Sequence, residues 1–314
     1  MMNGDEGVQN TNDDATACKL SAVKLGYWSD PYLSLMVKSG VKRAPEIHLG
    51  YYARVTGFRY LIDKFFDACD TKVQMINLGA GFDTLYWKLI GEGKPVKNFI
   101  EVDFSGVTAR KCYLIKRHKE LLAQVADSEG EVRLSKTDLH GNRYHLVAAD
   151  FSNKENLKEK LEESEVDYQC PTLVMAECAL VYADSAKVDQ MLEFLSSSFS
   201  SIAFINYEQL NMNDRFGSVM LENLMSRGCQ LSGVSACKDS SAQISRFTRA
   251  GWGTATCWNM NEVYSLLPQQ DIQRVERIEF LDEKELLQQL FHHYCITVAR
   301  KNSPNFNFDS INFD

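Results

Sequence analysis

The fold of this chain is decided by the stretch Gln74-Met75-Ile76-Asn77-Leu78-Gly79-Ala80-Gly81-Phe82-Asp83-Thr84, followed by Asn98-Phe99-Ile100-Glu101-Val102-Asp103. Residues 74–78 form an apolar run typical of a buried parallel strand, and Gly79 and Gly81 allow a tight turn that a ligand can approach closely. Asp103 ends the next apolar run, where a carboxylate can accept hydrogen bonds from both hydroxyls of a ribose. A plain turn between strand and helix would also contain glycines, but together with Asp103 the pattern favours a nucleoside-binding site.

The third position of the glycine turn separates two classes of nucleoside ligand. In the dinucleotide fingerprint a glycine stands there, because the helix packs closely against the strand beside the pyrophosphate. This chain has Thr84 instead. A ligand without phosphates, such as S-adenosylmethionine, therefore fits the turn better than a nicotinamide dinucleotide.

Length and charge narrow the class of protein. The chain has 314 residues, of which 45% are hydrophobic and 24% charged, so it can bury a large core in one elaborated domain or two. A formal net charge of −8 argues against nucleic acid as a partner, because phosphate binding needs clustered Lys and Arg. We also expect no association with a membrane, since no apolar run approaches the ~20 residues of a spanning helix.

The cysteines indicate the redox compartment. They are scattered over positions 18, 69, 112, 170, 178, 229, 237, 257 and 295. No C-x-x-C pair and no signal peptide accompanies them, so we expect reduced thiols and a cytoplasmic location. A metal site or a catalytic thiol is the less favoured alternative, because no His or Asp clusters at ligand spacing beside a Cys.

The order of patterns along the chain predicts an α/β fold. Residues 1–15 are polar and acidic, and we expect a disordered tail there. Residues 16–72 have helical periodicity and predict a helical cap, whereas the rest alternates strand and helix patterns within a single domain, residues 16–314. The expected fold is Rossmann-like, with a mainly parallel, seven-stranded, doubly wound sheet. The predicted strands are 74–78, 98–103, 144–149, 172–177, 201–207, 254–258 and 292–299.

Ligands of such sheets bind outside the carboxyl ends of the strands, and acidic residues stand at two further strand ends. Asp150 follows the third predicted strand, where it could contact an adenine or cap the helix that follows. Glu177 ends the fourth among apolar neighbours, and a carboxylate in such surroundings needs a cation or hydrogen-bond donors. A ligand amine is the favoured partner of Glu177, with an internal salt bridge as the alternative.

Several blocks of the sequence resemble the leucine carboxyl methyltransferases, which methylate the C-terminal leucine of the protein phosphatase 2A catalytic subunit. The resemblance covers nearly the whole chain after residue 15. Its blocks are Cys18-Lys19, Gly26–Tyr32, Lys42–Ile47, Gly50–Val55, Asn77–Gly81, Glu101–Asp103, Ala176–Tyr182 and Phe204–Gln209.

The resemblance implies a role for individual residues. Lys19 and Arg54 would bind the methionine carboxylate of S-adenosylmethionine, and Glu177 would lie near its amino group. Gly79 and Gly81 would lie beneath the cofactor and Asp103 would hold its ribose. The resemblance also implies that Asp150 and Phe151 line the adenine, and that Arg54 and Tyr182 orient the substrate carboxylate.

The implied chemistry needs neither a base nor an acid. A C-terminal carboxyl group has a pKa of about 3.3 to 3.7, so it is already an anion at neutral pH. Two alternatives share the cofactor site: a methyltransferase for small molecules, and a non-catalytic cofactor-binding partner of the phosphatase. A related tRNA-modifying enzyme carries a C-terminal propeller, whose repeats this sequence lacks.

Overall fold

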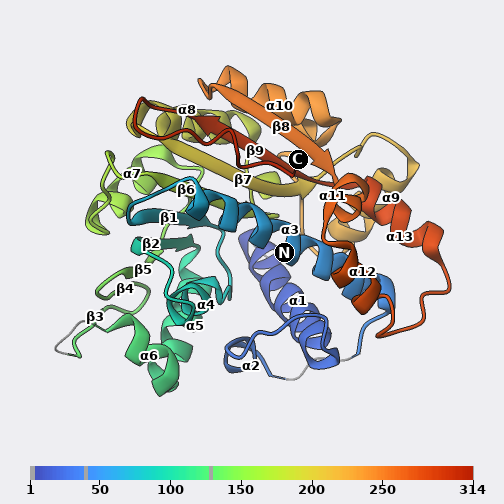
Figure 1. The fold of residues 1–314 in the computed structure, drawn as a ribbon, viewed down its shortest axis with the longest axis horizontal. Coiled ribbons are helices and arrows are strands. Elements are labelled where there is room, and N and C mark those ends of the chain that lie inside the picture. The colour runs from blue at the N-terminus through green and yellow to red at the C-terminus, as the bar shows by residue number, and fades with distance from the viewer. Residues whose placement is uncertain (1–3, 39–41, 127–129, 314) are drawn as a thin grey trace.

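The computed structural model describes residues 4–38, 42–126 and 130–313, which fold around one mixed β-sheet (Figure 1). The sheet has nine strands in the order β3-β4-β5-β2-β1-β6-β7-β9-β8. The strands are β1 (Val73–Leu78), β2 (Val96–Asp103), β3 (Arg133–Leu134), β4 (Leu139–His140), β5 (Tyr144–Ala148), β6 (Thr172–Glu177), β7 (Ile202–Gln209), β8 (Thr254–Asn259) and β9 (Tyr294–Lys301). β5, β2, β1, β6 and β7 are parallel, whereas β9 is antiparallel to both β7 and β8.

The seven strands expected from the sequence are all present, with ends that differ by a few residues. The expected strand number was wrong, however, because β3 and β4 add two antiparallel strands at one edge of the sheet. Each of these strands has only two residues, which is too short for a hydrophobic pattern to be detected in the sequence. The α/β class is confirmed. The sheet, however, has nine strands and contains both parallel and antiparallel pairs.

Helices cover both faces of the sheet, and alternate residues of each strand supply the two cores. On one face, Met75 and Phe99 pack with α3 (Pro45–Asp67), α4 (Leu85–Gly91), α5 (Ser105–Arg117), α6 (Lys119–Val125), α11 (Met260–Leu266), α12 (Gln269–Val275) and α13 (Lys284–His292). On the other, Ile76 and Ile100 pack with α7 (Lys154–Glu163), α8 (Ser185–Ser198) and α10 (Ser240–Arg249). This two-sided burial explains why the central strands read as continuous apolar runs.

The N-terminal region differs from expectation. α1 spans Gly4–Leu25, so the expectation of a disordered tail is wrong for residues 4–15, and residues 1–3 lie outside the described part of the chain. Tertiary contacts hold this polar segment: Asn12 Oδ1 accepts a hydrogen bond from the amide of Phe82 (2.8 Å), and Arg110 binds the carboxylate of Asp13 (2.9 Å). The helices expected within 16–72 are found as the second half of α1, α2 (Leu33–Met36) and α3.

In the described ranges, no helix combines the length and the apolar character that crossing a membrane requires.

Candidate active site

A cavity of about 970 Å³ lies at the carboxyl ends of the parallel strands, beneath α1 and α3. Every residue proposed from the sequence lines it: Lys19, Arg54, Gly79, Gly81, Asp103, Asp150, Phe151, Glu177 and Tyr182. Six different segments of the chain thus meet in one place. This meeting is what the sheet topology predicts for ligand-binding residues.

The glycine turn after β1 needs its glycines for both backbone conformation and space. Gly79 and Gly81 have φ angles of +66° and +52°, in the left-handed region that side chains disfavour. A Cβ on Gly79 would also lie 2.5 Å from the Cβ of Ala179, and one on Gly81 would lie 2.4 Å from Asn12 Oδ1. The turn is therefore pressed between α1 and the segment after β6, and its backbone faces the cavity.

Asp103 closes the same turn from the end of β2. Its Oδ2 accepts a hydrogen bond from the amide of Gly81 (2.7 Å), and its Oδ1 accepts one from the amide of Phe104 (2.7 Å). Burial raises the pKa of this carboxyl group, although the two amides oppose the shift. Each carboxylate oxygen has a further lone pair available for a ligand hydroxyl.

Asp150 and Phe151 line the cavity beside β5. Asp150 Oδ1 accepts hydrogen bonds from the amide (2.9 Å) and hydroxyl (2.7 Å) of Ser152, so the residue stabilises the turn before α7. Phe151 is buried, and its ring lies close to Gly79. The expectation that Asp150 could cap the following helix is wrong, because the side chain of Asn153 caps α7. Contact of Asp150 and Phe151 with an adenine stays a prediction.

Glu177 is the centre of a charged cluster that we call the open cluster, Lys19–Arg54–Glu177. The ammonium of Lys19 lies 3.0 Å from both carboxylate oxygens, and the guanidinium of Arg54 pairs with one of them. Burial opposes ionisation of Glu177, but Arg54 and Lys19 outweigh it and lower its pKa to about 2. The internal salt bridge is therefore what the structure shows, and a ligand amine as a further partner stays a prediction.

Aromatic rings and the backbone fix the orientation of Arg54. One guanidinium nitrogen donates to the carbonyl oxygen of Glu177 (3.1 Å), and the guanidinium carbon lies 4.6 Å from the ring centre of Tyr207 and 5.4 Å from that of Tyr51. Such cation–π contacts hold a guanidinium in one plane. Arg54 is thus placed as a rigid fork beside Glu177.

The cavity offers hydroxyl donors rather than bases. Tyr182, in the short 3-10 helix η1 (Leu180–Tyr182), has a pKa raised by burial, as do Tyr51 and Tyr294, which also line the cavity. These phenols therefore remain neutral at physiological pH. Among the described residues that line the cavity there is no histidine.

Several lining residues were not expected from the sequence. Asn12 holds the glycine turn, and nothing in its polar surroundings signals that role. Cys178 has a φ of +60°, and its sulfur accepts a hydrogen bond from Gln209 Nε2 (3.4 Å). Cys178 and Gln209 fall within the blocks that resemble the family, and Cys178 directly follows Glu177, so this position in the sequence could have suggested them.

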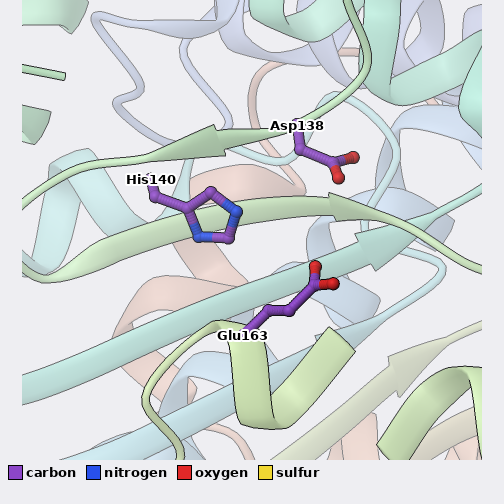
Figure 2. Close-up of side chains that lie close together, drawn as sticks. All are labelled: Asp138, His140 and Glu163. Carbon is purple, nitrogen blue, oxygen red and sulfur yellow. The ribbon is translucent and has the colours of Figure 1, made fainter. Parts of the chain in front are cut away.

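A second cluster of polar side chains lies away from this cavity, at the edge formed by β4 and α7. Figure 2 shows Asp138, His140 and Glu163 facing a common space, with candidate ligand atoms within 4.8 Å of one another. The ammonium of Lys160 lies 3.1 Å from Asp138 and 2.7 Å from Glu163, and so already supplies a cation to both carboxylates. The cluster is explained as an ion-pair network, and a metal ion would have to displace Lys160.

Comparison with known proteins identifies the family of this chain. The family model described as leucine carboxyl methyltransferase matches residues 8–196. Leucine carboxyl methyltransferase 1 of Rattus norvegicus is 41% identical over 312 residues, covering 98% of this chain and 94% of the relative. The protein of that name in Caenorhabditis elegans is 38% identical, covering 94% and 92%. Human tRNA wybutosine-synthesizing protein 4 is 33% identical over 94% of this chain but only 44% of its own length.

Solved structures agree on the fold. A methyltransferase structure from Thermobifida fusca matches with a TM-score of 0.53 at 13% identity, covering 87% of this chain and 93% of its own. A Haemonchus contortus phospholethanolamine N-methyltransferase 2, in complex with S-adenosylhomocysteine, matches with a TM-score of 0.50 at 11% identity, covering 97% and 61%. These neighbours show the class I methyltransferase fold.

Family and fold together make this protein a methyltransferase enzyme, and they indicate S-adenosylmethionine as its methyl donor. The family model and the similarity to the rat and nematode proteins, which extends over nearly the full length of the chain, identify the same family. The chain belongs to the leucine carboxyl methyltransferase family.

Proposed function

We propose that this enzyme transfers the methyl group of S-adenosylmethionine to the C-terminal leucine carboxylate of the protein phosphatase 2A catalytic subunit, forming a methyl ester. The observation that carries the proposal is the pairing of the open cluster with Asp103 in a cavity whose described lining has no histidine. Such a site can hold a nucleoside amino acid and a carboxylate, but it is not built to deprotonate an alcohol. The names of the relatives support a leucine carboxyl group as the methyl acceptor.

The charges of the open cluster match those of the amino-acid part of the cofactor. Lys19 and Arg54 would bind the methionine carboxylate, and Glu177 would accept hydrogen bonds from the ammonium group. A carboxylate that already holds two cations stays ionised at neutral pH, so it is available to a third donor. Asp103 would accept the ribose hydroxyls, with the adenine beside Asp150 and Phe151 and the backbone of Gly79 and Gly81 beneath the ligand.

The reaction itself depends on position rather than on proton transfer. The attacking carboxylate is ionised at neutral pH, and the departing thioether is neutral, so the protein has to align oxygen, carbon and sulfur in a line. We propose that Arg54 and the neutral hydroxyl of Tyr182 orient the carboxylate. Because Arg54 is already paired with Glu177, it can hold the substrate anion without fully neutralising it.

We further propose that the chain from α1 (Gly4–Leu25) onward, and not only from residue 16, works as one domain in the cytoplasm. α1, α2 and α3 would exclude water from the cavity, which strengthens the electrostatic interactions inside it. All nine cysteines are free, as expected in a reducing compartment. The net charge of −8 makes a nucleic-acid substrate unfavourable.

The test uses methyl-labelled S-adenosylmethionine and three forms of the phosphatase subunit: intact, lacking its last leucine, and amidated at its C-terminus. We expect label only on the intact form, released as methanol at alkaline pH because it is an ester. Equal labelling of the leucine-deleted form, or label that resists alkali, would refute the proposed substrate.

A further inference from the structure

α9 (Arg215–Ser226) is an apolar helix that the fold leaves largely uncovered. Gly217 is its buried residue, whereas the side chains of Val219 and Met225 are 49% and 66% exposed. An apolar helix with so little burial is unusual in a monomer and indicates an interaction surface.

One side of α9 continues into the catalytic cavity. Met220 and Leu224 line the cavity together with Tyr182, one of the residues proposed to orient the substrate carboxylate, and all three pack against the same small apolar cluster. The same helix therefore presents apolar side chains both to the outside of the molecule and to the cavity that holds the proposed reaction centre. A chain that enters the cavity along α9 would contact Met220 and Leu224.

A cation stands at the end of this surface. Arg227 follows α9 directly, lines the same cavity and is exposed. Among the side chains that the structure describes, none forms a salt bridge with Arg227. An arginine beside the apolar side chains of α9, in a protein of net charge −8, is suited to bind an acidic group of a partner.

We infer that α9 and Arg227 form the binding surface for the last residues of the protein substrate. The apolar side chains of that segment lie on Met220 and Leu224, and an acidic side chain a few residues before the terminal leucine pairs with Arg227. The inference rests on the proposed function and adds a specificity-determining residue to it. Because Arg227 contacts only the segment before the leucine, it affects substrate binding and not the cofactor.

The test uses synthetic peptides that end in leucine, with a single glutamate moved through the preceding positions and with lysine in its place as the reversed series. Wild type is compared with Arg227→Glu and with Arg117→Glu, which makes the same change of charge at an exposed arginine at the end of α5, away from the cavity. For the glutamate position that faces Arg227, we expect Arg227→Glu to raise KM about five- to tenfold. The lysine peptide should restore KM, and kcat and the Kd of S-adenosylmethionine should be unchanged.

The outcomes separate this inference from the proposed function. If wild type methylates the leucine peptides but Arg227→Glu and Arg117→Glu give the same KM at every position, the surface is wrong and the function stands. If wild type labels neither the peptides nor the intact phosphatase subunit, both are wrong.

Discussion

Two charged clusters lie on either side of the glycine turn, and they differ in what can reach them. The open cluster, Lys19–Arg54–Glu177, faces the cavity. The second, which we call the sealed cluster, is Glu101–Lys111–Tyr144, and all three side chains are fully buried. Lys111 binds Glu101 and also donates to the carbonyl oxygen of Asp83 (2.8 Å), so it ties the turn to α5.

Burial raises the pKa of both glutamates, but their net shifts have opposite signs. Burial raises the pKa of Glu101 to about 7 despite Lys111, whereas Arg54 and Lys19 overcome burial and lower the pKa of Glu177 to about 2. A perturbed pKa alone would mark both as functional. Accessibility distinguishes the two glutamates, because only Glu177 faces the cavity and can contact a ligand. The sealed cluster therefore has a structural role.

Breaking the sealed cluster should have the largest effect, and it should be on stability. Lys111→Met leaves Glu101 buried without its cation, which should lower the free energy of unfolding by about 3–5 kcal/mol. Urea denaturation measures this, and the protein that remains folded should bind S-adenosylmethionine normally. Unchanged stability together with lost binding would reverse the roles assigned to the two clusters.

Changing the geometry of the open cluster should affect activity instead. Arg54→Lys keeps the charge but loses the planar fork that pairs with Glu177 and stacks on Tyr207, so we expect kcat/KM to fall about 100-fold, or ~2.7 kcal/mol. Arg117→Lys, at an exposed site, is the matched control. Wild-type turnover in Arg54→Lys would show that charge alone matters there.

Replacing Asp103, the acid proposed to bind the cofactor ribose, should have a smaller effect, on cofactor affinity. Asp103→Ala removes the acceptor proposed for the ribose hydroxyls and should weaken S-adenosylmethionine binding by ~1.5–3 kcal/mol, as measured by calorimetry. The amides of Gly81 and Phe104 also lose their acceptor, so the melting temperature should be recorded alongside. A folded variant with unchanged affinity would remove Asp103 from this role.

The smallest effect concerns pH and separates the two glutamates directly. Because the folded-state pKa of Glu101 is raised from 4.5 to about 7, native protein binds more protons than unfolded protein between these values, and its stability falls as pH rises through this window. Glu177 behaves oppositely: its contribution is fully present above pH 4.5 and is lost as pH falls through about 2.

Urea denaturation of wild type and Glu101→Gln at pH 5 and pH 7.5 tests this sign. The stability of wild type relative to the variant should decrease at the higher pH by on the order of 1 kcal/mol. A relative stability that increases with pH would contradict the direction of the Glu101 shift.

Periodicity in the sequence predicted the central strands, and the positions where these strands end predicted the acidic residues of the cavity. The central strands, buried on both faces, gave clear apolar runs, and Asp103, Asp150 and Glu177 could be placed at strand ends because parallel strands finish at one edge. The roles of these residues toward the cofactor stay predictions.

What the sequence could not predict depends on long-range contacts. The first half of α1 is polar. Asn12 binds the glycine turn and Asp13 binds Arg110, and these two contacts hold the helix in place although the partners lie about 70 to 100 residues away in the sequence. Composition alone favours disorder for such a segment. The salt bridge that completes the open cluster likewise joins two residues, Lys19 and Glu177, that are 158 positions apart in the sequence.

The most direct test of the account compares two ligands in three proteins. S-Adenosylhomocysteine carries the amino-acid group, whereas 5′-methylthioadenosine has the same nucleoside and thioether without it. If the open cluster binds the amino-acid group, wild type should prefer S-adenosylhomocysteine about 100-fold, or ~2.7 kcal/mol, by calorimetry. That preference should fall below about tenfold in Glu177→Gln and persist in Glu101→Gln. A preference that survives intact in Glu177→Gln would contradict the central claim that this cluster receives the cofactor.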